Sequence, residues 1–101
     1  MINKALLFRF ESQTDEDTMD TFLEDLATEV SWEKATRAWF ANQYDASHFG
    51  TFAVFSDNGG RFSHLTGQIP RELGMTGLSL LGGAPEVHMV DVMTGTARQG
   101  D

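Results

Sequence analysis

The chain has 101 residues, 41% of them hydrophobic and none of them cysteine, which favours one domain over residues 1–101 without disulfides or thiolate chemistry. Its formal net charge is −8, and this acidic balance makes nucleic acid and anionic membranes poor candidate partners. Because the sequence shows no long apolar run typical of a membrane span or signal peptide, we expect a cytoplasmic protein.

The first third of the sequence predicts a strand followed by an amphipathic helix. Hydrophobic and other residues alternate over residues 3–10, with both phenylalanines on one side, which indicates a strand. Thr14 precedes three acidic residues, with Asp17 three positions on, which is close to the capping-box pattern of a helix start. The helix that follows places its apolar residues on one face: Met19, Phe22, Leu23, Leu26, Ala27 and Val30.

The segment WFANQYDASHFGTFAVF, residues 39–55, consists mostly of strand-forming residues around a short polar gap. Strands are expected over residues 36–44 and 48–55, because both stretches are rich in aromatic and β-branched residues. The turn-forming residues between them predict that the two strands pair as an antiparallel hairpin.

A second helix is expected after the hairpin. Asp57 is positioned to cap this helix, which runs to about Thr66. Phe62 and Leu65 are its expected inward-facing residues, and Gly67 is suited to terminate it.

The remaining sequence predicts a helical turn, a loop and a last strand. Pro70 can open a short turn of helix that stops at the next glycine along. Residues 78–85 are apolar but glycine-rich, which indicates a partly buried loop. Alternation over residues 87–93 indicates a strand, and residues 94–101 resemble a tail, so the core of the domain should span residues 3–93.

The element order is βαββαβ, which predicts an α+β domain of ferredoxin-like type, with an antiparallel sheet and helices on one of its faces. Both faces of the hairpin are apolar, because Trp39 and Ala41 alternate with Ala38 and Phe40. Helices can cover only one of these faces. We therefore expect a homodimer that buries sheet against sheet.

Two polar residues of the hairpin and one histidine are the candidate functional groups. Period-two counting places Asn42 and Tyr44 on one strand face together with Phe40. They can orient a flat, oxygen-bearing ligand there, or be solvated beside the turn. His64 can act as a general base near neutral pH, or be a packed or capping residue. The three histidines fit no metal motif, so we expect no metal site.

Residues 49–67, FGTFAVFSDNGGRFSHLTG, lead from a strand through an acidic turn into a helix that carries His64 and Leu65. With the element order and the expected dimer, this segment resembles the antibiotic-biosynthesis monooxygenase-like family of dimeric α/β-barrel proteins, over about residues 3–93. The resemblance implies a small homodimeric domain that holds an aromatic ligand in a cavity between the sheet and the helices of each protomer. Some members of that family oxidise anthrone- or quinol-type substrates with dioxygen, without metal, flavin or haem.

The resemblance also implies which residues line the cavity: Phe8, Phe10, Trp39, Phe40, Asn42, Tyr44, Phe52, Phe62, His64 and Leu65. The hairpin can send only one of its alternating sets into this cavity, and we expect the set with Asn42 and Tyr44. In the expected reaction His64 removes a phenolic proton, while Asn42, Tyr44 or Arg61 holds the oxyanion, with no cofactor. The expected substrate-binding residues are Trp39, Phe40, Phe52, Arg61, Phe62 and Leu65.

Two other functions fit the same fold. One is a non-catalytic dimeric module that binds a small apolar molecule, and the other is an isomerase or lyase that acts on a polyketide-type intermediate. An open cavity beside His64 with at least two convergent polar groups would favour an enzyme. A filled core, with His64 bonded to the backbone, would favour the binding module.

Overall fold

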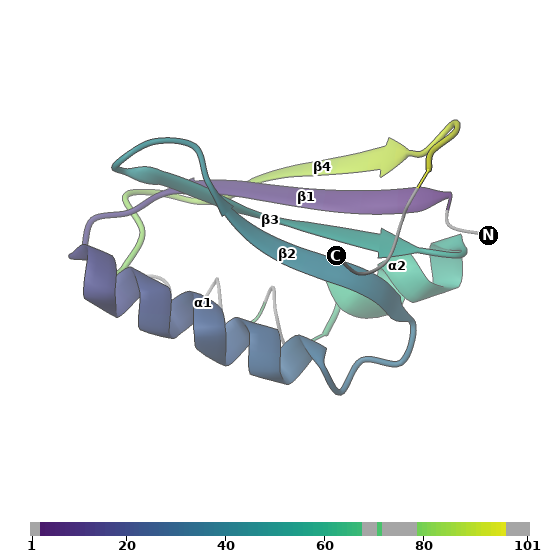
Figure 1. The fold of residues 1–101 in the computed structure, drawn as a ribbon, viewed down its shortest axis with the longest axis horizontal. Helices are drawn as coiled ribbons and strands as arrows, with labels where there is room; N and C mark the ends of the chain where they lie inside the picture. Colours follow the sequence, from purple (N-terminus) through teal and green to yellow (C-terminus); the bar gives the residue numbers. More distant parts are fainter. Residues whose placement is uncertain (1–2, 68–70, 72–78, 97–101) are drawn as a thin grey trace.

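The computed structural model describes residues 3–67, 71 and 79–96. In chain order it contains β1 (Lys4–Glu11), α1 (Glu16–Val30), β2 (Thr36–Gln43), β3 (His48–Phe55), α2 (Asn58–Leu65) and β4 (Glu86–Asp91). The strands form one antiparallel sheet in the order β2-β3-β1-β4, with β1 and β3 in its centre. Both helices lie on the same face of this sheet (Figure 1). The predicted α+β, ferredoxin-like architecture is therefore confirmed.

Each helix begins at an aspartate whose carboxylate accepts a backbone N–H. Asp15 accepts from Thr18 N at 2.7 Å, so the prediction that Thr14 begins the first helix is wrong by one residue. The carboxylate caps as well as a hydroxyl does, and its charge suits the positive end of the helix dipole. Asp57 accepts from Gly60 N at 2.8 Å and caps α2 as predicted.

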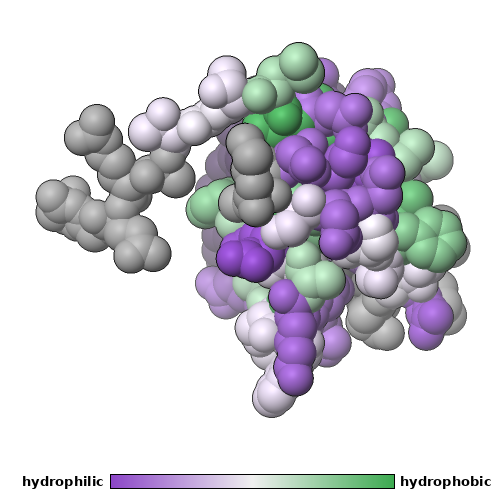
Figure 2. Space-filling view, turned by 90° about the vertical axis from the view of Figure 1, so that its right-hand side faces the viewer, coloured by the Kyte–Doolittle hydropathy of each residue, from purple (hydrophilic) through white to green (hydrophobic). Residues whose placement is uncertain are grey.

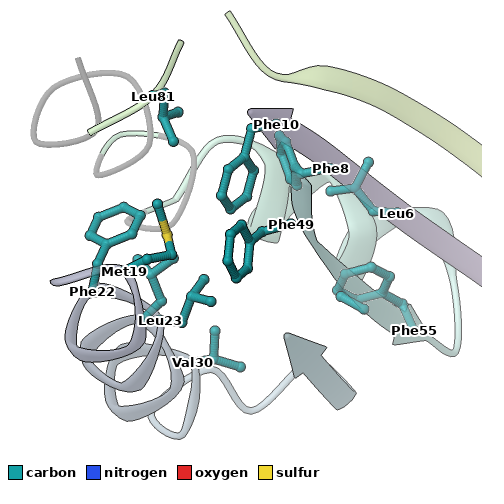
Figure 3. Packing of buried hydrophobic residues seen from close by; sticks show 12 residues of the cluster. Leu6, Phe8, Phe10, Met19, Phe22, Leu23, Val30, Phe49, Phe55 and Leu81 are labelled. Carbon is teal, nitrogen blue, oxygen red and sulfur yellow. The ribbon is translucent and has the colours of Figure 1, made fainter. Parts of the chain in front are cut away.

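The hydrophobic core lies between α1 and the sheet. The helix contributes Met19, Phe22, Leu23, Leu26 and Val30, as the spacing predicted, whereas Ala27 is exposed. The central strands contribute Leu6, Phe8, Phe10, Phe49, Ala53 and Phe55. Figure 3 shows the rings of Phe10 and Phe49 between the sheet and α1. Because the core takes one face of the helix and every second residue of the strands, the sequence shows helical spacing in α1 and alternation in the strands.

The side that α2 turns towards the sheet differs from the prediction. Gly60 and His64, one helical turn apart, are buried, whereas Phe62 is 66% exposed. Leu65 is partly buried against the core, as expected. A Cβ atom at Gly60 would lie 3.3 Å from Ala35, so α2 passes close to the residue before β2 at this glycine. The expectation that Phe62 faces inward is wrong because this close approach determines which side packs.

The chain before and after the last strand follows the prediction in part. β4 begins one residue earlier and ends two residues earlier than the predicted strand over residues 87–93. The helical turn predicted after Pro70 lies outside the described residues. In the loop before β4, Leu81 is buried and bridges to Ser12, so this loop is partly buried as predicted. Within the described ranges, the helices are too short or too polar to cross a membrane.

Candidate functional site

The strand register determines which hairpin residues face the helices. Residues paired across neighbouring strands share a face, and Trp39 pairs with Ala53, which belongs to the core. Trp39 is itself partly buried against that core. Phe40 and Asn42 alternate with it and lie on the opposite side, where Phe40 is 61% exposed. The expectation that the set with Asn42 and Tyr44 enters the helix-side cavity is therefore wrong.

We call the helix-free side of the sheet the outer face. Its members, taken from the register, include Ala5, Leu7, Arg9, Phe40, Asn42, Gly50, Phe52, Val54, His88 and Val90. Tyr44 follows β2 and lies over Gly50, where a Cβ atom would approach its ring to 3.0 Å. The guanidinium carbon of Arg9 is 4.9 Å from the centre of the same ring, a cation–π arrangement. The outer face thus combines an apolar centre with a polar end beside the hairpin turn.

His64 lies on the other side of the sheet, in a polar cluster built from three elements. Its side chain is 1% exposed, and its Nδ1 is 2.5 Å from Oε1 of Glu33, which follows the end of α1. Thr36, the first residue of β2, donates its hydroxyl to the same carboxylate oxygen at 2.8 Å. The imidazole ring also contacts the ring of Phe55, with centroids 5.4 Å apart. A carboxylate and a hydroxyl therefore converge on one buried imidazole.

A cavity of about 310 Å³ adjoins this cluster. It is lined by the connection from α1 to β2 and by α2: Glu29, Trp32, Glu33, Lys34, Ala35, Thr36, Gly60, Ser63, His64 and Gly67. Trp32 is 79% exposed at this cavity. Nε2 of His64 is buried and has no hydrogen-bonding partner in the part of the chain that the structure describes. Nε2 is consequently the ring nitrogen that Glu33 and Thr36 leave unoccupied.

A separate groove of about 470 Å³ lies between α1 and the edge strand β2. Leu23, Trp39 and Phe49 contribute apolar surface to it, and Phe40 and Asn42 border it from the strand. The structure therefore does not bring the expected site residues together in one place. Trp39 belongs to this groove, His64 to the cavity beside α2, and most of the remaining hairpin residues to the outer face.

Arg61 is engaged at the far end of the sheet. Its guanidinium donates to the carbonyl oxygen of Val90 at 3.1 Å and to Oδ1 of Asn58 at 2.9 Å, and it lies 3.5 Å from Asp91. Lys4, and to a smaller extent Arg61, hold the pKa of the Asp91 carboxyl below its usual range. Figure 2 looks onto this end of the molecule, where hydrophilic side chains gather in the centre and hydrophobic ones at the upper and right edges. These contacts tie α2 to the edge of the sheet and leave Arg61 outside the lining of the His64 cavity.

Glu33 and Thr36 are functional candidates that sequence reasoning missed. Glu33 is 31 residues from His64 in the chain, and it stood in the sequence as one acid among many in the first third. No spacing rule links a residue after one helix to a residue inside another. The pairing results from the close approach of α2 to the start of β2.

The hairpin turn holds a second, exposed pair of ionisable side chains. The Asp45 carboxylate accepts the backbone N–H groups of Ser47 and His48 at 2.9 and 2.8 Å, and its Oδ1 is 2.8 Å from Nδ1 of His48. These bonds, the one from the Ser47 backbone first, lower the pKa of Asp45 to about 2. In the described part of the chain no group of three histidine or acidic side chains is arranged to hold a metal ion.

The substitution Asp45→Asn is expected to make the stability of the fold less dependent on pH in the acid range. The unfolded-state pKa is close to 3.8 and the folded-state pKa is about 2, so ionised Asp45 stabilises the fold above the first value. This contribution disappears as the pH falls through the second. The difference in melting temperature between the natural protein and the variant should be largest near about pH 5 and shrink towards about pH 2. Asp25→Asn, at an exposed position on α1, is the control, and a difference that stays constant with pH would contradict the prediction.

Comparison with known proteins gives the same fold. Neither protein-family models nor curated proteins match the chain. Among solved structures, a candidate antibiotic biosynthesis monooxygenase from Caulobacter crescentus CB15 matches with a TM-score of 0.76 and 12% identity, over 92% of each chain. A mutant of SnoaB, a cofactor-independent oxygenase from Streptomyces nogalater, matches with a TM-score of 0.69 and 13% identity, over 97% of this chain and 95% of that one. The fold is thus that of the antibiotic-biosynthesis monooxygenase-like proteins, as the sequence resemblance predicted.

A nearer likeness places the chain in a family. The NE2512 protein of unknown function from Nitrosomonas europaea matches with a TM-score of 0.90 and 33% identity, over 99% of this chain and 98% of that one. At this identity and coverage the likeness extends beyond the fold. The present chain belongs to the same family as the Nitrosomonas protein.

Proposed function

We propose that this protein is a cofactor-independent monooxygenase that acts on an aromatic polyphenol of quinol or anthrone type. The observation that carries the proposal is the cavity of about 310 Å³ beside His64, with the side chains of Glu33 and Thr36 converging on the buried imidazole. His64 is bonded to a carboxylate, whereas a filled, non-catalytic core would have it bonded to the backbone. The shared fold with SnoaB, a cofactor-independent oxygenase, gives further support.

The cavity offers what such a reaction needs from the protein. Nε2 of His64 can take a phenolic proton, because Nδ1 is already occupied by Glu33. The resulting substrate anion is itself the reductant of dioxygen, so the protein supplies orientation and a base. Trp32 offers an exposed flat surface at the same cavity for an aromatic ring. Nε2 is buried in this structure, so the proposal requires a rearrangement of the cavity wall that brings substrate within reach of it.

The proposed catalytic base is His64, and the proposal gives Asn42 and Tyr44 no part in the reaction at this cavity. Both belong to the outer face or its edge, on the opposite side of the sheet. The same holds for Phe40 and Phe52. These residues are proposed to have another role, as the surface of a homodimer. The outer face is apolar at its centre, and Val90 is 41% exposed there because both helices lie on the other side (Figure 1).

Oxygen uptake with a panel of anthrones and hydroquinones tests the proposal. His64→Ala is expected to lower the turnover number by roughly 10²- to 10⁴-fold, the usual contribution of a general base. His88→Ala is the control for removal of a histidine away from the His64 cavity, and because His88 lies on the outer face the oligomeric state of this variant is compared with that of the natural protein. Asn42→Ala, on the outer face, should leave oxygen uptake unchanged if the site lies on the helix side of the sheet.

Each other outcome identifies a different site or a different function. Loss of uptake in Asn42→Ala but not in His64→Ala would move the site to the outer face. Substrate conversion without oxygen uptake would indicate an isomerase or lyase. A folded natural protein that consumes no oxygen, yet binds these aromatic compounds, would be the non-catalytic binding module.

A further inference from the structure

The carboxylate of Glu33 receives two donors on a single oxygen. The Thr36 hydroxyl donates to Oε1 at 2.8 Å, and Nδ1 of His64 lies 2.5 Å from the same atom. The Glu33 side chain is 22% exposed, so water has limited access to compete for these bonds. An ionised carboxylate only accepts hydrogen bonds, and it therefore fixes the direction of both.

The direction of the bond to Glu33 determines where the imidazole carries its proton. Nδ1 must carry the hydrogen in order to donate to the carboxylate. A neutral imidazole has one protonated and one unprotonated nitrogen, so Nε2 of His64 then holds the lone pair. Nε2 has no other partner in the described part of the chain that would impose the opposite arrangement.

The ring is also fixed in orientation. It packs against Phe55 with centroids 5.4 Å apart, and its side chain is 1% exposed. Glu33 follows the C-terminal end of α1, while His64 belongs to α2, so the bond between them also connects the two helical segments. The imidazole can neither turn over nor exchange its nitrogens without breaking the bond to Glu33.

We infer that Glu33 is a positioning residue for His64: it holds the imidazole in the Nδ1–H tautomer and presents the Nε2 lone pair as the base. Thr36 assists by holding the carboxylate. A buried carboxylate that orients a histidine base is a recurrent arrangement in enzymes, where its loss changes the tautomer and slows the chemical step. This inference rests on the proposed function only for the step in which Nε2 takes a substrate proton.

The tautomer is measured first, without substrate, by long-range ¹H–¹⁵N NMR at a pH where the imidazole is neutral. In the natural protein the His64 signals should show a protonated Nδ1 and an unprotonated Nε2. In Glu33→Gln the amide can donate as well as accept, so the Nε2–H tautomer should become populated. Asp25→Asn, which makes an acid-to-amide change at an exposed position on α1, should leave the signals unchanged. An Nε2–H tautomer in the natural protein, or an unaltered tautomer in Glu33→Gln, would overturn the inference.

The kinetic arm uses the same variants in the oxygen-uptake assay. Glu33→Gln should lower kcat by about 10²-fold or more with little change in KM, because substrate binding is retained and the base is misoriented. Thr36→Val, which removes the donor that steadies Glu33, should give a smaller loss of the same kind. An altered tautomer with unchanged kcat would overturn the positioning role, and it would also count against Nε2 of His64 as the base. If the natural protein consumes no oxygen, the proposed function fails, and the NMR result alone decides whether Glu33 sets the tautomer.

Discussion

Phe55→Ala is expected to lower the free energy of unfolding by about 3–5 kcal/mol, a large part of the 5–15 kcal/mol typical of small domains. Phe55 is fully buried in the central strand β3, in the core cluster and against the ring of His64. Its removal loses the transfer free energy of the ring and leaves a cavity that the central strand cannot close. Urea unfolding followed by circular dichroism measures the change.

Phe62→Ala is the matched control, because the same side chain is 66% exposed on α2. This substitution should change the free energy of unfolding by no more than about 0.5 kcal/mol. The pair also tests the orientation of α2, since sequence spacing had placed Phe62 inside. Equal losses of stability in the two variants would show that Phe62 is buried and that α2 packs with the Phe62 side against the sheet.

Phe40→Glu is expected to weaken the proposed homodimer by about 10²-fold or more in its dissociation constant. Phe40 is 61% exposed on the outer face and pairs with Phe52. A dimer that joins two outer faces would bury the new carboxylate without a partner, which costs several kcal/mol. Sedimentation velocity over a range of protein concentrations measures the shift.

Phe62→Glu introduces the same charge on the helix side and should leave the dissociation constant unchanged. Circular dichroism should show both variants folded, because neither substitution touches the buried core. A natural protein that remains monomeric at high concentration would refute the dimer. A dimer weakened only by Phe62→Glu would place the interface on the helix side.

The helices and strands were largely predictable from sequence because their signals are local. The apolar residues of α1 repeat at helical spacing, and five of the six expected ones are buried. Residues 48–55 form a strand with the predicted bounds, and Asp57 caps the next helix. Each of these features depends on neighbours within a few residues, which is the range that periodicity and capping patterns report.

Which face of each element points inward was harder to predict from the sequence. The hairpin alternates between two sets that are both apolar, so its pattern fits equally well with either face against α1. The structure turns Trp39 inward and Phe40 outward. In α2 the eight-residue length gives little periodicity, and the tight contact at Gly60 overrides the apolar spacing.

The sequence by itself determined the element order, the α+β class, the likeness to oxygenase folds and His64 as the leading candidate base. Only the tertiary structure placed Glu33 and Thr36 beside that histidine and separated it from Asn42 and Tyr44. The physical reason is that helices and strands arise from interactions between near neighbours. A partly buried hydrogen bond across 31 residues depends instead on how packed elements meet in space.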